Sequence, residues 1–132
     1  MPSSQRRKSG ESKIKARGRA TSTGPNCTEW GFLTTWEFQV RPSAEKHFRK
    51  LYGPDGGWAR LFSQDESYMG TELIRDLKGI RTYLTLDFWT SEEAYDAFRK
   101  RHHAKYEALD RKYEEMTDGE REIGRFVRVP SK

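Results

Sequence analysis

Cysteine and long hydrophobic runs are both scarce in this chain. Cys27 is the only cysteine, so no disulfide can form within the chain, and a reducing compartment is the expected setting. No apolar run approaches the roughly 20 residues that span a bilayer. The twin arginine at Arg6 and Arg7 has no hydrophobic stretch after it, which argues against an export signal. We therefore expect a cytoplasmic protein with no membrane partner.

The common sequence signatures of catalysis are also missing. The three histidines and the scattered carboxylates show no metal-ligand spacing of the HExxH type. The glycine-rich segment 53–57 lacks the lysine pattern that follows a phosphate-binding loop. No arrangement of Ser, His and a carboxylate suggests a nucleophilic triad. We expect neither a metal nor a nucleotide cofactor.

Positive charge is concentrated at the start of the chain. Residues 1–27 contain seven Lys or Arg and one Glu, which is +6, whereas the whole chain is +5, so residues 28–132 carry −1. A segment so polar cannot bury enough surface to order itself, so we expect a disordered basic leader over 1–27. A near-neutral domain does not suit a nucleic-acid binder, and only the leader could contact nucleic acid.

Residues 28–132 have the composition of one small folded domain. The chain has 132 residues, which suits one domain, and a mean hydropathy of −1.03, but its 17 aromatic residues supply material for a core. The hydrophobic patterns follow the order βα(α)ββαβ, the split-βαβ order of ferredoxin-like α+β domains. The expected elements are a strand over 32–40, a helix capped by Ser43 and ended by Gly53, a helical turn around 58–62, a hairpin of strands 67–75 and 81–89, a long helix and a last strand over 122–129.

The long helix carries the clearest periodic signal. Thr90 and Glu93 match a capping box, and Gly119 could close the helix. Apolar and aromatic residues then recur at steps of three and four, which predicts one buried stripe. The stripe consists of Tyr95, Phe98, His102, Tyr106, Leu109, Tyr113 and Met116.

The predicted four-stranded antiparallel sheet is apolar on both faces. On the third strand Leu84, Leu86 and Phe88 alternate with Tyr83, Thr85, Asp87 and Trp89; on the second, Met69, Thr71 and Leu73 alternate with Tyr68, Glu72 and Ile74. The helices of one chain can cover only one face, and an exposed second face should be polar. We therefore expect a homodimer that buries the second face about a twofold axis.

Two segments resemble the antibiotic biosynthesis monooxygenase (ABM) superfamily. YLTLDFWTSEEAYDAF (83–98) resembles its junction between the third strand and the following helix, and WEFQVRPSAEKHF (36–48) resembles its first strand and turn. The resemblance implies a dimeric α+β barrel with a pocket between sheet and helices. Some members of the superfamily oxidise aromatic polyketides without metal or flavin, another branch degrades haem, and many have no known activity.

The resemblance makes Trp89, at the end of the third strand, a candidate catalytic residue. Trp89 could stack on a planar aromatic ligand or fill the core, and both interpretations stay open. His102 could act as a general base or be a buried structural histidine. Tyr83, Thr85 and Asp87 are the candidate substrate-binding residues, although Asp87 could instead pair with an arginine such as Arg75 or Arg125, and Tyr83 could equally be packing.

The sequence also departs from both known chemistries of the superfamily. Thr85 stands four residues before Trp89, where the quinone-forming branch carries Asn, and the single asparagine of the chain is Asn26. Arg99 stands at the spacing of the axial His of the haem-degrading branch, so we expect no cofactor. Two functions remain open: a cofactor-independent monooxygenase acting on a planar aromatic small molecule, and a non-catalytic ligand-binding or stress-associated dimeric barrel.

Overall fold

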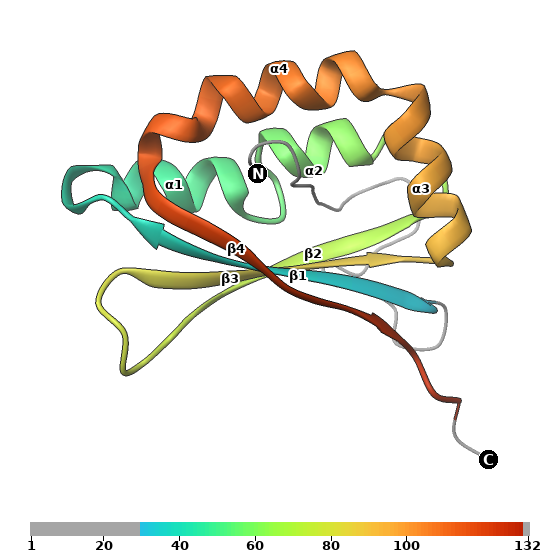
Figure 1. Ribbon diagram of the computed structural model, residues 1–132, viewed down its shortest axis with the longest axis horizontal. Helices are drawn as coiled ribbons and strands as arrows, with labels where there is room; N and C mark the ends of the chain where they lie inside the picture. Colours follow the sequence, from blue (N-terminus) through green and yellow to red (C-terminus); the bar gives the residue numbers. More distant parts are fainter. Residues whose placement is uncertain (1–29, 131–132) are drawn as a thin grey trace.

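The computed structural model describes residues 30–130 as two layers, a sheet and a layer of helices. The four strands are antiparallel neighbours in the order β2-β3-β1-β4. All the helices within residues 30–130 lie on one side of the twisted sheet (Figure 1). The elements are β1 (Phe32–Val40), η1 (Pro42–Ala44), α1 (Glu45–Tyr52), α2 (Gly57–Phe62), β2 (Tyr68–Arg75), β3 (Thr82–Trp89), α3 (Glu92–Arg101), α4 (His103–Tyr113), η2 (Glu114–Met116) and β4 (Thr117–Val127). The predicted ferredoxin-like α+β fold is confirmed.

The central strand β1 follows the period of two in its sequence. Phe32, Trp36, Phe38 and Val40 are buried toward the helices, and Thr34 continues their row. On the neighbouring strand β3, the helix-facing partners include Tyr83, Thr85, Asp87 and Trp89, again as the alternation predicted. Side chains from both strands and from the helices form one aromatic-rich core.

Strand β2 departs from its predicted alternation at Gly70. The pairing with β3 shifts between Tyr68 and Gly70, and Gly70 has a φ of 116°, a conformation that a residue with a Cβ rarely adopts. The extra residue of this bulge places Tyr68 opposite Trp89 and Thr71 opposite Asp87. Tyr68 and Thr71 therefore share the helix-facing side, whereas simple alternation had put them on opposite sides.

The predicted single long helix is two helices that meet at His102. The backbone of His102 has φ −112° and ψ 28°, outside the helical region, and α3 and α4 run in different directions (Figure 1). The two halves pack on different elements: Phe98 of α3 contacts Trp89 of the sheet, and Tyr106 of α4 contacts Trp58 of α2. The break allows one continuous aromatic stripe to follow both surfaces.

Three predicted helix ends are wrong. Ser91 caps α3, since its Oγ accepts a hydrogen bond from the Ala94 amide at 3.1 Å, in place of Thr90. Ser43 makes no capping hydrogen bond, because it lies inside the short 3₁₀ turn η1. Gly119 lies inside β4, which begins at Thr117, five residues earlier than expected. Gly53 does follow α1, in an extended conformation.

The second face of the sheet carries a row of apolar side chains. Leu33, Leu84 and Leu86 are partly exposed there, and Phe88 is covered by the ring of Trp30, with ring centroids 5.0 Å apart. Ile74 on β2 and Phe126 on β4 extend the row to both edges, with 44% and 46% of their surfaces exposed. We call this surface the open face, because no described helix covers it (Figure 1).

The cap of α3 can be tested with a pair of neighbouring substitutions. Ser91→Ala removes the acceptor for the Ala94 amide and should lower the free energy of unfolding by about 1 kcal/mol. Thr90→Ala, one residue away and exposed, should change it by less than about 0.5 kcal/mol. Urea denaturation measures both. A larger loss of unfolding free energy for Thr90→Ala than for Ser91→Ala would indicate that Thr90 caps the helix and would contradict the structure.

Candidate functional site

Nine side chains on the helix-facing side of β2, β3 and β1 form three rows, with Asp87 at the centre. The backbone register sets Thr71, Asp87 and Thr34 side by side across the three strands. One row nearer the end of β3 lie Tyr68, Trp89 and Phe32; one row further back lie Leu73, Thr85 and Trp36. We call this array the buried polar cluster. It places a carboxylate and several hydroxyl groups beneath aromatic rings.

A short hydrogen-bonded relay holds Asp87. Its side chain is fully buried, and its Oδ1 accepts a hydrogen bond of 2.6 Å from the Thr71 hydroxyl. The Thr71 oxygen lies 2.5 Å from the hydroxyl of Tyr68. Because the single Thr71 proton is donated to Asp87, Tyr68 must donate to Thr71. The relay runs from the carboxylate in the middle of the sheet to Tyr68, which is partly exposed at the edge strand.

The electrostatics of the relay keep Tyr68 protonated. Burial raises the pKa of the Tyr68 hydroxyl well above its usual value, and the nearby carboxylates of Asp87 and, to a smaller extent, Asp55 raise this pKa further. Tyr68 therefore remains a hydrogen-bond donor at any neutral pH. Both hydrogen bonds of the relay are therefore donated toward Asp87, from Tyr68 to Thr71 and from Thr71 to Asp87.

Three further polar atoms of the cluster are buried without a hydrogen-bond partner within the described residues. They are the hydroxyl oxygens of Thr34 and Thr85 and the indole Nε1 of Trp89. Buried polar groups are ordinarily satisfied, and each exception costs free energy. An ordered water, or a ligand that places polar groups at this depth, would satisfy these atoms. The arrangement therefore suits a molecule that is mostly apolar and carries a few polar substituents.

Aromatic rings surround Trp89. Its indole contacts the rings of Phe62, Tyr68, Tyr95 and Phe98 at centroid distances of 5.2–5.3 Å. The side chain is fully buried. Trp89 thus packs in the core and also presents its Nε1 toward the interior, and both interpretations of this residue remain compatible with the geometry.

Tyr83 faces the same layer but uses its hydroxyl elsewhere. The Tyr83 hydroxyl donates to Glu45 at 2.8 Å and accepts from the Arg49 Nε at 2.7 Å, both on α1. Burial and the hydrogen bond to Glu45 raise the pKa of Tyr83. Its ring packs on Phe48. The role of Tyr83 in substrate binding stays a prediction, but its hydroxyl already has two partners.

The three histidines differ in their surroundings. The partly buried ring of His102 lies on Phe98, with centroids 4.7 Å apart, and Phe98 in turn lies on Trp89. His102 is therefore one ring removed from Trp89. His103 is exposed and lies 3.8 Å from Glu107, and His47 is exposed.

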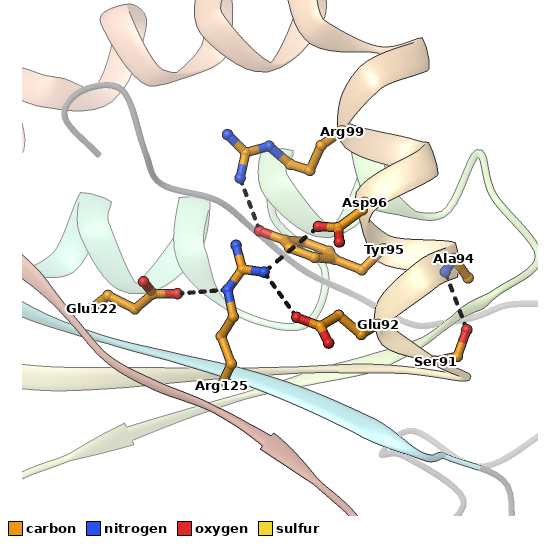
Figure 2. Close-up of polar contacts among 8 residues, drawn as sticks. All are labelled: Ser91, Glu92, Ala94, Tyr95, Asp96, Arg99, Glu122 and Arg125. Carbon is orange, nitrogen blue, oxygen red and sulfur yellow. Dashed lines mark hydrogen bonds and ion pairs between the residues drawn. The ribbon is translucent and has the colours of Figure 1, made fainter.

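Two arginines flank Tyr95 beside α3 and β4 (Figure 2). Arg125 of β4 forms ion pairs with Glu92, Asp96 and Glu122 at 3.3–3.6 Å. It is therefore engaged away from Asp87, and Arg75 is exposed. The Arg99 Nη1 donates to the Tyr95 hydroxyl at 3.1 Å, and its guanidinium lies 3.9 Å from the centroid of the Tyr106 ring.

Arg99 stands at the spacing of the axial His of the haem-degrading branch, and a guanidinium has no lone pair to offer iron. The residue at this position therefore does not fit a haem iron. Across residues 30–130, no three His, Cys, Asp or Glu side chains are grouped closely enough to hold a metal ion. None of the described helices is both long and apolar enough to cross a membrane.

Sequence patterns alone missed four members of the site: Thr34, Tyr68, Thr71 and Arg99. Thr34 could have been found, because it falls on the buried side of a strand whose other residues there are aromatic or aliphatic. Thr71 sits in register with Asp87, but no sequence signal fixes that register. Tyr68 depends on the bulge at Gly70, and Arg99 depends on how α3 packs beside β4.

Fold and site together define a class: a split-βαβ domain whose interior, between sheet and helices, combines aromatic walls with buried polar groups. The chain belongs to the antibiotic biosynthesis monooxygenase (ABM) family, whose model matches residues 32–106. That match spans β1 through the first turn of α4 and includes the buried polar cluster. No curated protein matches the sequence.

Several solved structures share this fold. A dimeric ferredoxin-like protein from an uncultured marine organism superposes with a TM-score of 0.57 at 14% identity, over 81% of this chain and 95% of that one. A Pseudomonas aeruginosa protein gives 0.53 at 11% identity, over 76% and 96%. A Fusobacterium nucleatum protein, proposed to be a monooxygenase, gives 0.51 at 12% identity; the match covers 75% of this chain and only 43% of that one. At such identities the likeness establishes the fold alone.

Two buried threonines on the same side of β2 and β3 give a matched test of the cluster. Thr71→Val removes the donor to Asp87 and should lower the free energy of unfolding by about 1–3 kcal/mol, because the buried carboxylate loses a partner. Thr85→Val removes a hydroxyl that has no partner in the described part of the chain, and should be neutral or stabilising. Thermal and urea unfolding of the two variants measure the difference. Equal losses would show that the relay does not hold Asp87.

Proposed function

We propose that this protein is a cofactor-independent monooxygenase that oxidises a planar aromatic small molecule with O2. The observation that carries the proposal is the buried polar cluster. It combines a carboxylate and unsatisfied hydroxyl and indole groups with aromatic rings, on the side of the sheet that the helices cover. Membership of the ABM family supports the choice of chemistry.

The chemistry requires no electrons from the protein. A tricyclic phenol with a CH2 between two aryl rings first loses a proton and becomes an electron-rich anion. The anion reacts with O2, the CH2 becomes C=O, and the second oxygen atom leaves as water. This oxidation removes four electrons from the substrate, and O2 accepts all four. The protein has only to bind the ring system, accept the first proton and exclude bulk water.

Side chains of the cluster suit those tasks. Asp87 lies at the centre of the array and can accept a proton, while the relay through Thr71 and Tyr68 keeps its carboxylate oriented. Thr85 and Trp89 offer polar groups to the substituents of the substrate. His102 remains a second proposed base, from the partly buried junction of α3 and α4.

A non-catalytic ligand-binding barrel is the second candidate. The observation that favours it is the identity of the residue four positions before Trp89: Thr85 stands where the quinone-forming branch carries Asn, so a group used for oxidation there is absent. The same interior would then bind an aromatic molecule without turnover. Binding of nucleic acid through residues 1–27, which lie outside the described residues, and a cytoplasmic location also stay predictions.

We further propose a homodimer joined through the open face. Leu33, Leu84, Leu86 and Phe126 form an apolar surface that the helices of the same chain leave uncovered. A second copy would cover it isologously and close the two sheets into a barrel. The marine protein of the same fold is dimeric, which supports a dimer of this chain.

Oxygen uptake tests the proposed reaction. With an anthrone-type tricyclic phenol, an oxygen electrode should record enzyme-dependent consumption of one O2 per quinone formed. Asp87→Asn, His102→Ala or Trp89→Phe should lower the rate, by about 10²–10⁴-fold for the group that accepts the proton. His103→Ala, an exposed neighbour of His102, should leave it unchanged.

The outcomes separate the two candidate functions. Unchanged turnover in all three site variants would reject the assignment of the site. Absence of turnover, together with thermal stabilisation by the same phenol, would favour the ligand-binding barrel.

Light scattering tests the dimer. The native protein should have a mass of about 31 kDa, twice the 15.5 kDa of one chain. Leu86→Glu places a charge in the middle of the open face and should give monomers, because burying an unpaired carboxylate is costly. Ala108→Glu, exposed on α4 away from that face, should remain dimeric. A monomeric native protein would refute the proposal.

A further inference from the structure

We infer that Arg99 binds a negatively charged group of the ligand, so that the natural ligand is a planar aromatic acid. This inference rests on the proposed function, since it names the chemical class of the molecule bound at that site.

Aromatic side chains hold Arg99. Its guanidinium lies 3.9 Å from the centroid of the buried Tyr106 ring, and its Nη1 donates to the Tyr95 hydroxyl at 3.1 Å. Both contacts restrict the side chain without neutralising it. No carboxylate lies within ion-pair distance of Arg99 in the described part of the chain. A partly buried guanidinium with no anionic partner is costly unless a ligand supplies the charge.

The neighbouring Arg125, in contrast to Arg99, is paired with carboxylates of the same chain. Three carboxylates, from Glu92, Asp96 and Glu122, surround it (Figure 2). Asp96 lies one turn before Arg99 on α3, yet it pairs with Arg125. Three carboxylates thus share the single charge of Arg125, so negative charge is in excess around it. Of these two neighbouring arginines, Arg99 is the one with no carboxylate within ion-pair distance in the described part of the chain.

Tyr95 connects Arg99 to the interior. The Tyr95 ring contacts Trp89 at 5.2 Å and Phe32 at 5.7 Å, and both belong to the outer row of the buried polar cluster. Its hydroxyl, at the other end of the ring, contacts Arg99. One aromatic ring therefore separates the guanidinium from the residues proposed to bind the ring system. A ligand that binds both groups must therefore extend past the buried Tyr95 ring, with an acidic substituent at the end near Arg99.

The buried polar cluster and the guanidinium of Arg99 suit opposite ends of one aromatic ligand. Thr34, Thr85 and Trp89 each have a buried polar atom with no hydrogen-bond partner among residues 30–130, and these atoms suit phenol or carbonyl substituents. An arginine binds a carboxylate through two parallel hydrogen bonds, and a cation that is already restricted loses little entropy when it does so. The ligand class is thus an aromatic ring system with polar substituents at one end and a carboxylate at the other.

Binding of two matched probes tests the inference. We would measure 2-naphthoate and its uncharged analogue 2-naphthamide by titration calorimetry with the full chain. The native protein should bind the acid at least about tenfold more tightly than the amide, a difference of about 1.4 kcal/mol. Arg99→Gln should remove that preference, Arg99→Lys should retain part of it, and Lys100→Gln, an exposed cation one residue further along α3, should leave it intact.

The ratio of the two affinities separates recognition of charge from a structural role. If Arg99→Gln weakens both probes equally, Arg99 only supports the fold and the inference fails. If the native protein binds both probes equally, or binds neither, the inference fails as well. Oxygen uptake with the neutral phenol is measured independently, so the proposed function can survive either failure.

Discussion

The burial of one carboxylate in the middle of the sheet constrains the rest of the structure. Asp87 is fully shielded, and a charge at such a position requires donors close to it. Thr71 supplies one, and it can do so only because β2 pairs with β3 in the observed register. Tyr68 supports Thr71 only because the bulge at Gly70 turns it to the same side. The register of β2 and β3, the bulge at Gly70 and the hydrogen-bonded relay thus all contribute to holding the Asp87 carboxylate.

Much of the fold follows from periodicity in the sequence. Alternation on β1 and β3 correctly separates the helix-facing side chains from those of the open face, since a strand has a fixed period of two. The aromatic stripe from Tyr95 to Met116 correctly marks the buried side of the last two helices. The break at His102 could not be read in this way, because neither Gly nor Pro marks it. It arises from packing against two different elements, which a single sequence does not display.

The site was only partly predictable for the same reason. Thr85, Asp87 and Trp89 lie on one side of one strand, so the alternation groups them, and the structure brings them together. Tyr83 is on that side too, but α1 occupies its hydroxyl through Glu45 and Arg49. Thr34 and Thr71 join the site from other strands. Local patterns report which way a side chain faces, whereas contacts between strands and helices depend on register and docking.

The bulge at Gly70 has a consequence for sequence change in this part of the chain. Edge strands such as β2 ordinarily tolerate the gain or loss of a residue, because little depends on their outer side. Here the deletion of one residue between Tyr68 and Thr71 would remove the bulge and leave the two side chains two residues apart, which regular alternation places on the same side of the strand. The length of this edge should therefore be less strictly constrained than its side chains, and homologous chains that keep the acid on β3 should keep a hydroxyl group beside the threonine with or without the extra residue.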